Sequence, residues 1–74
     1  PLVARNCWVQ GRRIYLEIDA DRSMSFPASQ YVGLETAPQV ELEKIHLNTD
    51  GSQITWDSLD QTISVDEVAA PRFN

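Results

Sequence analysis

The sequence predicts an α+β fold in a single domain that spans residues 1–74. Three observations lead to this prediction. Apolar and polar residues alternate before Pro27, the spacing becomes helical after it, and a second alternating stretch begins near residue 44. Alternation with a period of two indicates half-buried strands, whereas apolar residues three or four apart indicate helices. A chain of 74 residues has room for one small core.

A three-stranded antiparallel meander is predicted first. Its best-defined strand covers residues 13–19, in which the even-numbered side chains are apolar and the odd-numbered ones are polar or aromatic. The β-forming residues 3–10 precede this strand, and residues 23–26 restore the alternation after it. Gly11 supplies the first turn because glycine accepts a positive φ, and residues 19–22 supply the second.

Helical segments are predicted after the meander. Pro27 ends the third strand because it lacks an amide hydrogen, and residues 28–37 have helical spacing. Thr36, with Gln39 three residues later, has the pattern of a capped helix start. Residues 40–43 alternate and would equally fit a strand, but the initiation signal favours a helix.

A β-hairpin and a short C-terminal helix complete the predicted order. Residues 44–48 and 53–56 form the hairpin around the Asp50-Gly51 turn, and a loop and a short extended piece follow. Ser64 and Glu67 form a capping box that opens the last helix, which residues 69–71 finish.

The predicted core contains the inward-facing apolar residues of all these elements. They are Ile14, Leu16, Ile18, Met24, Phe26, Leu34, Ile45, Leu47, Ile54, Trp56, Leu59, Ile63 and Val65.

The net charge of −5 lies entirely in the second half of the chain. Residues 1–37 carry four basic and four acidic side chains, whereas residues 38–74 carry two basic and seven acidic ones. Nucleic-acid binding requires clustered Lys and Arg, so direct contact with DNA or RNA is not expected. An acidic half can steer association with a basic protein partner, or simply maintain solubility.

The single cysteine, Cys7, excludes an internal disulfide and favours a reducing, cytoplasmic location. No apolar run approaches the roughly 20 residues that span a bilayer, and no signal-peptide pattern opens the chain. We therefore expect a cytoplasmic protein without a membrane partner.

The acidic loop after Trp56 is expected to be structural. Asp57, Asp60 and Ser64 offer polar groups, but nothing nearby supplies a third hard metal ligand or a desolvated carboxylate. Asp60 is expected to accept hydrogen bonds from backbone N–H groups while Leu59 fills the core.

No catalytic, cofactor or metal residues are predicted, and the protein is not expected to be an enzyme. The residues from His46 to Asp57 superficially follow a calcium-loop spacing, but the first and last ligands do not match and strands flank the loop. Cys7 has no base at a recognisable spacing.

The aromatic residues point instead to an interaction surface. Trp56 is in phase with the core, whereas Trp8 and Tyr15 fall on the sheet face away from the helices. Exposed aromatics beside Arg12 and Arg13 have the composition of a protein interface.

A family resemblance rests on the last third of the chain. The segment Ile54-Thr55-Trp56-Asp57-Ser58-Leu59-Asp60-Gln61-Thr62-Ile63-Ser64-Val65, preceded by Met24-Ser25-Phe26-Pro27 and by Leu34-Glu35-Thr36-Ala37, resembles the bacterial domain of unknown function 2442 family. Asp57 stands where that family tends to have Pro, and Thr62 stands where it tends to have a second acid. Residues 19–21, which correspond to the Asp-Gly turn of that family's pattern, contain no glycine. The missing acid argues against carboxylate-pair chemistry in the loop.

The resemblance implies a small α+β fold without established enzymatic activity. It also implies a non-catalytic interaction module, such as the antitoxin-like or accessory partner of a small protein encoded by an adjacent gene. The alternative is an accessory or dimerisation domain of a transcription regulator whose DNA-binding segment lies outside this chain. Exposed strand edges make a homodimer compatible with either. Because the chain begins at Pro1, we expect upstream residues to have been removed or to belong to a longer product.

Overall fold

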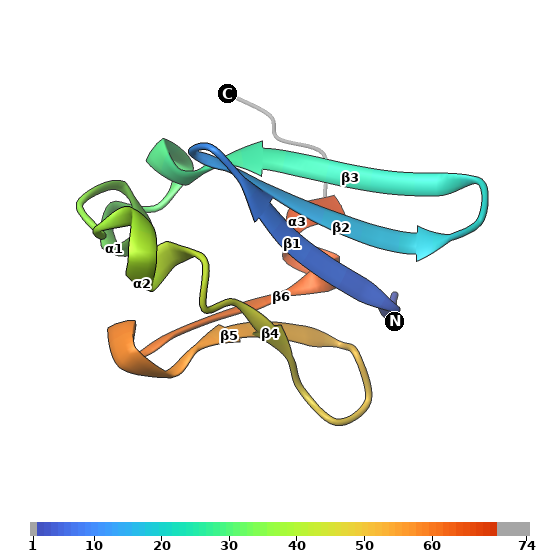
Figure 1. Ribbon diagram of the computed structural model, residues 1–74. Coiled ribbons are helices and arrows are strands. Elements are labelled where there is room, and N and C mark those ends of the chain that lie inside the picture. Colours follow the sequence, from blue (N-terminus) through green and yellow to red (C-terminus); the bar gives the residue numbers. More distant parts are fainter. Residues whose placement is uncertain (1, 70–74) are drawn as a thin grey trace.

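The computed structural model describes residues 2–69 and contains two three-stranded antiparallel sheets (Figure 1). The strands of the first sheet are β1 (Asn6–Gln10), β2 (Arg13–Asp19) and β3 (Arg22–Pro27), in the order β1-β2-β3. Those of the second are β4 (His46–Leu47), β5 (Gln53–Trp56) and β6 (Gln61–Ser64), in the order β4-β5-β6. The α+β prediction and its first meander are confirmed. The predicted hairpin gains β6 as a third strand and forms a separate sheet.

Sequence features at the ends of the strands explain the first meander. Gly11 has φ +62 at the first central position of the β1–β2 turn, which is the geometry of a type II′ hairpin. The Ala28 amide points toward β2 and donates to the Arg12 carbonyl at 2.9 Å. Since backbone groups alternate along a strand, the nitrogen of the preceding Pro27 faces away from β2. Proline is tolerated there because no N–H is required at the edge of the sheet.

Short helices connect the two sheets at one end of the molecule, on the left in Figure 1. They are the 3-10 helix η1 (Ala28–Gln30), α1 (Val32–Glu35) and α2 (Gln39–Leu42). The helical prediction for residues 40–43 is confirmed over the strand alternative, since α2 ends at Leu42.

The predicted N-cap at Thr36 is wrong. Helix α2 begins after Pro38, whose extended backbone precedes the helix and provides no side-chain cap. Thr36 instead ends α1, and its hydroxyl donates to the Val32 carbonyl at 3.5 Å. The sequence suggested a helical segment over residues 28–37 and a capped second turn after it, whereas the structure has the one-turn helices α1 and α2.

The N-terminal segment before β1 joins the two sheets through the β4–β5 loop. The Ala4 amide donates to the Gly51 carbonyl at 2.7 Å, and both residues are buried. Gly51 has φ +76, and a Cβ on it would lie 2.4 Å from the Ala4 carbonyl oxygen. Only glycine fits this position, because both the backbone conformation and the space exclude a side chain.

The last described elements are η2 (Asp57–Leu59), β6 and α3 (Val65–Ala69). Half of the predicted capping box is confirmed, because the Ser64 hydroxyl oxygen accepts the Glu67 amide at 3.0 Å. The Glu67 carboxylate does not return a bond to the Ser64 amide and accepts the Tyr31 hydroxyl at 2.8 Å. The α3 helix contacts both β3 and β6 and so covers the side of the core between the sheets. The predicted end of this helix at residues 70 and 71 lies outside the described residues.

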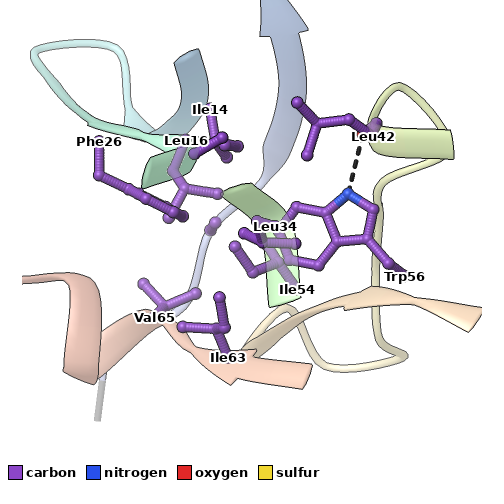
Figure 2. Close-up of a cluster of buried hydrophobic side chains, with 11 residues drawn as sticks. Ile14, Leu16, Phe26, Leu34, Leu42, Ile54, Trp56, Ile63 and Val65 are labelled. Atoms are coloured by element: carbon purple, nitrogen blue, oxygen red, sulfur yellow. Dashed lines mark hydrogen bonds between the residues drawn. The ribbon is translucent and has the colours of Figure 1, made fainter. Parts of the chain in front are cut away.

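The core lies between the two sheets and the short helices (Figure 2). Eight predicted core residues are buried: Ile14, Leu16, Phe26, Leu34, Ile54, Trp56, Ile63 and Val65. Five others, Ile18, Met24, Ile45, Leu47 and Leu59, pack against this core but are only partly buried. The small residues Ala4, Ala28 and Ala37, together with Leu42, are buried instead. Alanines fill positions where backbone segments approach closely, which the prediction from large apolar residues overlooked.

A buried hydrogen bond fixes the largest core side chain. Trp56 is fully buried, and its indole Nε1 donates to the Leu42 carbonyl at 2.8 Å (Figure 2). This bond satisfies the polar group of the indole and joins β5 to the end of α2. Among residues 2–69, no helix is long and apolar enough to cross a membrane.

Candidate interaction surface

The outward side of the first sheet carries a stacked aromatic pair. Trp8 on β1 lies opposite Tyr15 on β2, and their ring centroids are 5.6 Å apart with planes only 4° from parallel. Trp8 is 38% exposed and Tyr15 is half-buried. The strand period places both side chains away from the core, because their neighbours Ile14 and Leu16 point inward.

Polar and charged side chains surround this pair. We define the aromatic face by the outward-facing residues of the first sheet: Asn6, Trp8, Gln10, Arg13, Tyr15, Glu17, Ser23 and Ser25. Arg13 donates from Nε to the Ser25 hydroxyl at 3.2 Å. Glu17, on the other side of Tyr15, pairs through Oε1 with Arg5 Nε at 3.3 Å. The aromatic pair therefore lies between an arginine and a glutamate of the same strand.

Arg12, which we expected beside Arg13 on this surface, has another position. It lies in the turn, and its guanidinium donates to the carbonyls of Leu34, Glu35 and Ala37 at 3.1, 2.9 and 2.9 Å. These carbonyls end α1 and begin the connection to α2, so Arg12 caps the corner between the helices. Gln39 also bonds to the turn, donating from Nε2 to the Gly11 carbonyl.

The loop after Trp56 is arranged differently from the sequence-based expectation. Asp60 has a left-handed backbone with φ +53, and its amide donates to the Asp57 carbonyl at 3.2 Å. Within residues 2–69, its exposed carboxylate accepts no hydrogen bond, so the expected bonds from backbone N–H groups to this carboxylate are not formed. Aspartate suits the position because it tolerates the left-handed conformation. Leu59 is half-buried against the core, and Ser64 caps α3.

Asp57 contacts a histidine on the surface. Its Oδ2 lies 3.1 Å from Nε2 of His46, while Nδ1 of the same ring lies 3.3 Å from the Leu47 carbonyl. Both side chains are substantially exposed, at 82% for Asp57 and 50% for His46. The pair is an ion pair only when the imidazole is protonated. Across the described part of the chain, no group of three or more His, Cys, Asp or Glu side chains could hold a metal ion.

The remaining titratable groups have local explanations. Partial burial raises the pKa of the Cys7 thiol, so it is held in its protonated, less reactive form. The pKa of Asp19 is lowered first by the Asp21 amide and then by Arg22. The hydroxyls of Ser58 and Ser52 are the first causes of the lowered pKa values of Glu41 and Asp50. These three carboxylates lie in separate turns and on different elements, and they do not converge.

The sequence-based site therefore separates into two parts. Trp8, Arg13 and Tyr15 lie together on the aromatic face, whereas Arg12 belongs to the helix corner. Glu17 lies on the aromatic face and was overlooked, although its odd number in the alternating strand placed it with Tyr15. The signal was present in the strand period.

Comparison with known proteins gives a family and a fold. No curated protein matches the chain. A crystal structure of a protein of unknown function from Rhodospirillum rubrum ATCC 11170 has the same fold, with a TM-score of 0.84 and 20% sequence identity. The similarity covers 93% of this chain and 86% of that one. The family model described as "Protein of unknown function (DUF2442)" matches residues 6–74, so the chain belongs to the DUF2442 family.

Proposed function

We propose that the protein is a non-catalytic protein-interaction module whose contact surface is the aromatic face. The observation that carries this proposal is the Trp8–Tyr15 stack, which lies on the outward side of a sheet whose other side already forms the core. No element within residues 2–69 covers the outer side of this pair, and Trp8 is 38% exposed.

The composition of the face supports binding to another protein. Tryptophan, tyrosine and arginine are the residue types most enriched among those that dominate interface energies. Trp8 and Tyr15 hold each other in place, so little side-chain freedom is lost when a partner covers them. Arg13 stands at the border of the pair and can donate to a partner carboxylate or carbonyl.

A non-catalytic role is supported by the arrangement of the titratable groups. The lowered pKa values of Asp19, Glu41 and Asp50 arise from hydrogen bonds to residues beside them, and none of the three carboxylates is buried. Structural hydrogen bonds of this kind stabilise local conformation. They do not create the desolvated acid or base that catalysis requires.

The partner class in this proposal is a small cytoplasmic protein, and the product of an adjacent gene is the first candidate. The second half of the chain carries two basic and seven acidic residues. This negative charge would steer association with a basic partner. The protein would then act as the antitoxin-like or accessory member of such a pair.

Binding measurements with the two neighbouring gene products test the proposal. We expect a complex at micromolar concentration in calorimetric titrations, and we expect Trp8→Ala to weaken it at least tenfold, about 1.4 kcal/mol. The matched control is Val40→Ala, which removes an apolar side chain that is 63% exposed but lies on α2. A complex that tolerates Trp8→Ala as well as Val40→Ala would refute the aromatic face, and two folded neighbours that do not bind would refute the partner class.

A further inference from the structure

The aromatic face has a symmetric arrangement of side chains. Three cross-strand rows follow one another along β1 and β2, pairing Asn6 with Glu17, Trp8 with Tyr15, and Gln10 with Arg13. The aromatic row lies in the middle. An amide side chain and a charged side chain lie in the row on either side, with opposite charges at the two ends.

This arrangement is complementary to itself. Consider a two-fold axis that lies in the interface and runs across the strands through the middle row. It places β1 over β1 and β2 over β2 of the second copy, with the strand directions reversed. Trp8 and Tyr15 then meet their own counterparts, and Arg13 of each copy faces Glu17 of the other. A two-fold interface requires such a self-complementary patch, in which residue i contacts j and j contacts i.

We propose, resting on the proposed function of this face, that a second copy of this chain binds it when no other protein does, face to face about that axis. The dimer brings together the two aromatic pairs and forms two symmetric ion pairs between Arg13 and Glu17.

Both charged groups can make further hydrogen bonds. Within residues 2–69, Arg13 uses only Nε in a hydrogen bond, and Glu17 uses only Oε1. Each lies two residues from Tyr15, about 7 Å along the strand. Packed sheets cross at about 30°, so at this distance from the axis their long side chains still reach each other. The other oxygen of Glu17 accepts from the second copy while Arg5 keeps its bond.

The expected dimer is weak. The aromatic face spans about five residues along each of three strands, or about 17 by 14 Å. A standard interface buries about 800 Å² of each partner. That standard area would be roughly a sixth of the 4649 Å² of accessible surface, which exceeds what this face alone provides. We therefore expect dissociation constants in the micromolar range and dimers in rapid exchange.

Sedimentation equilibrium of the 74-residue chain between about 5 and 500 µM tests the proposal. The wild type should shift from monomer to dimer over this range. Arg13→Glu and Glu17→Arg should each place like charges opposite one another twice, and each should weaken self-association at least tenfold. An equimolar mixture of these two variants should form a heterodimer, because both of its contacts again join opposite charges.

Matched controls separate this effect from changes in net charge or folding. Lys44→Glu and Asp21→Arg make the same changes in charge away from the aromatic face, and both should leave the dimer unchanged. Circular dichroism should show that all variants are folded, since Glu17→Arg also removes the partner of Arg5. The double variant R13E/E17R supplies a second reading, because it should restore self-association.

The outcomes distinguish this inference from the proposed function. A wild type that stays monomeric at 500 µM, or a dimer that ignores both charge reversals, overturns the inference. If such a monomer still loses a neighbouring protein upon Trp8→Ala, the proposed function stands without the homodimer. If Trp8→Ala affects neither self-association nor partner binding, both proposals fail.

Discussion

Replacing Gly51 with alanine should be the most damaging of the three glycine-to-alanine substitutions. The new Cβ would lie 2.4 Å from the Ala4 carbonyl oxygen, which belongs to backbone and cannot rotate away. A positive φ of 76° costs a non-glycine residue about 1–2 kcal/mol. Displacing the segment also breaks the Ala4–Gly51 hydrogen bond, which contributes about 1 kcal/mol. The loss should total about 2–3 kcal/mol.

Gly11→Ala provides the matched comparison. Gly11 has a similar positive φ of 62°, but a Cβ there would meet no atom within 4 Å. Its substitution should therefore cost only the backbone part, about 1–2 kcal/mol. The difference between the two variants isolates the contact between Gly51 and Ala4.

Urea unfolding, monitored by fluorescence of the buried Trp56, measures both losses. For a domain of this size the midpoint should move about 1 M for each kcal/mol. We expect shifts of about 2–3 M for Gly51→Ala and about 1–2 M for Gly11→Ala, by the same slope. Because small cores supply only about 3–5 kcal/mol, the Gly51 variant should be partly unfolded in water.

Equal midpoint shifts for Gly51→Ala and Gly11→Ala would refute this reasoning. Gly51→Asn gives a second reading, because asparagine tolerates a positive φ but still carries the Cβ. If Gly51→Asn is as stable as the wild type, the loss comes from backbone conformation and not from the approach to Ala4.

Three further predictions concern other parts of the fold. Trp56→Phe leaves the buried Leu42 carbonyl without its donor and should lower the free energy of unfolding by about 1–3 kcal/mol, measured by thermal melting followed by circular dichroism. Arg12→Lys keeps the charge but cannot reach three carbonyls at once, so urea unfolding should show a loss of about 1–2 kcal/mol; an unchanged midpoint would contradict the corner-capping role. Hydrogen bonds lower the pKa of Asp50 below its ordinary 3.8, so its contribution should be complete above pH 3.8 and be lost as the pH falls through the folded pKa. The stability difference between wild type and Asp50→Asn should therefore shrink upon acidification from pH 5 to 3, and a growing difference would have the wrong sign.

The strands were predictable because alternation and turn chemistry act locally. Residues 13–19 have one apolar and one polar side in any sheet that buries the apolar side, and Gly11 sets the turn before them. The Ser64 cap is likewise a contact between residues three apart. Such features depend on little beyond the neighbouring residues, so the structure reproduces them.

The features that were missed depend on contacts between distant parts of the chain. Leu42 is buried, and its carbonyl accepts a hydrogen bond from the Trp56 indole, 14 residues away. The burial of Ala4 follows from its approach to Gly51. The N-cap prediction at Thr36 failed because Thr36 ends α1, while α2 begins only after Pro38. No local pattern distinguishes these arrangements.

The candidate site shows the same division. Trp8, Tyr15 and Arg13 share the aromatic face because the strand period and the register place them there. Neither the strand period nor the register places Arg12 beside Arg13, because Arg12 lies in the turn. The direction of its side chain depends on the helix corner that lies beside the turn. Adjacency in sequence was therefore a poor guide to adjacency on the surface.

The Arg12 contact also favours the native register of the first hairpin. If β1 and β2 paired one residue out of step, position 12 would leave the turn and every inward side chain of the slipped strand would face outward. The guanidinium would then miss the three carbonyls of the helix corner. The corner between α1 and α2 thus stabilises only the native register of the hairpin. Hairpins in another register should be short-lived once this corner has formed.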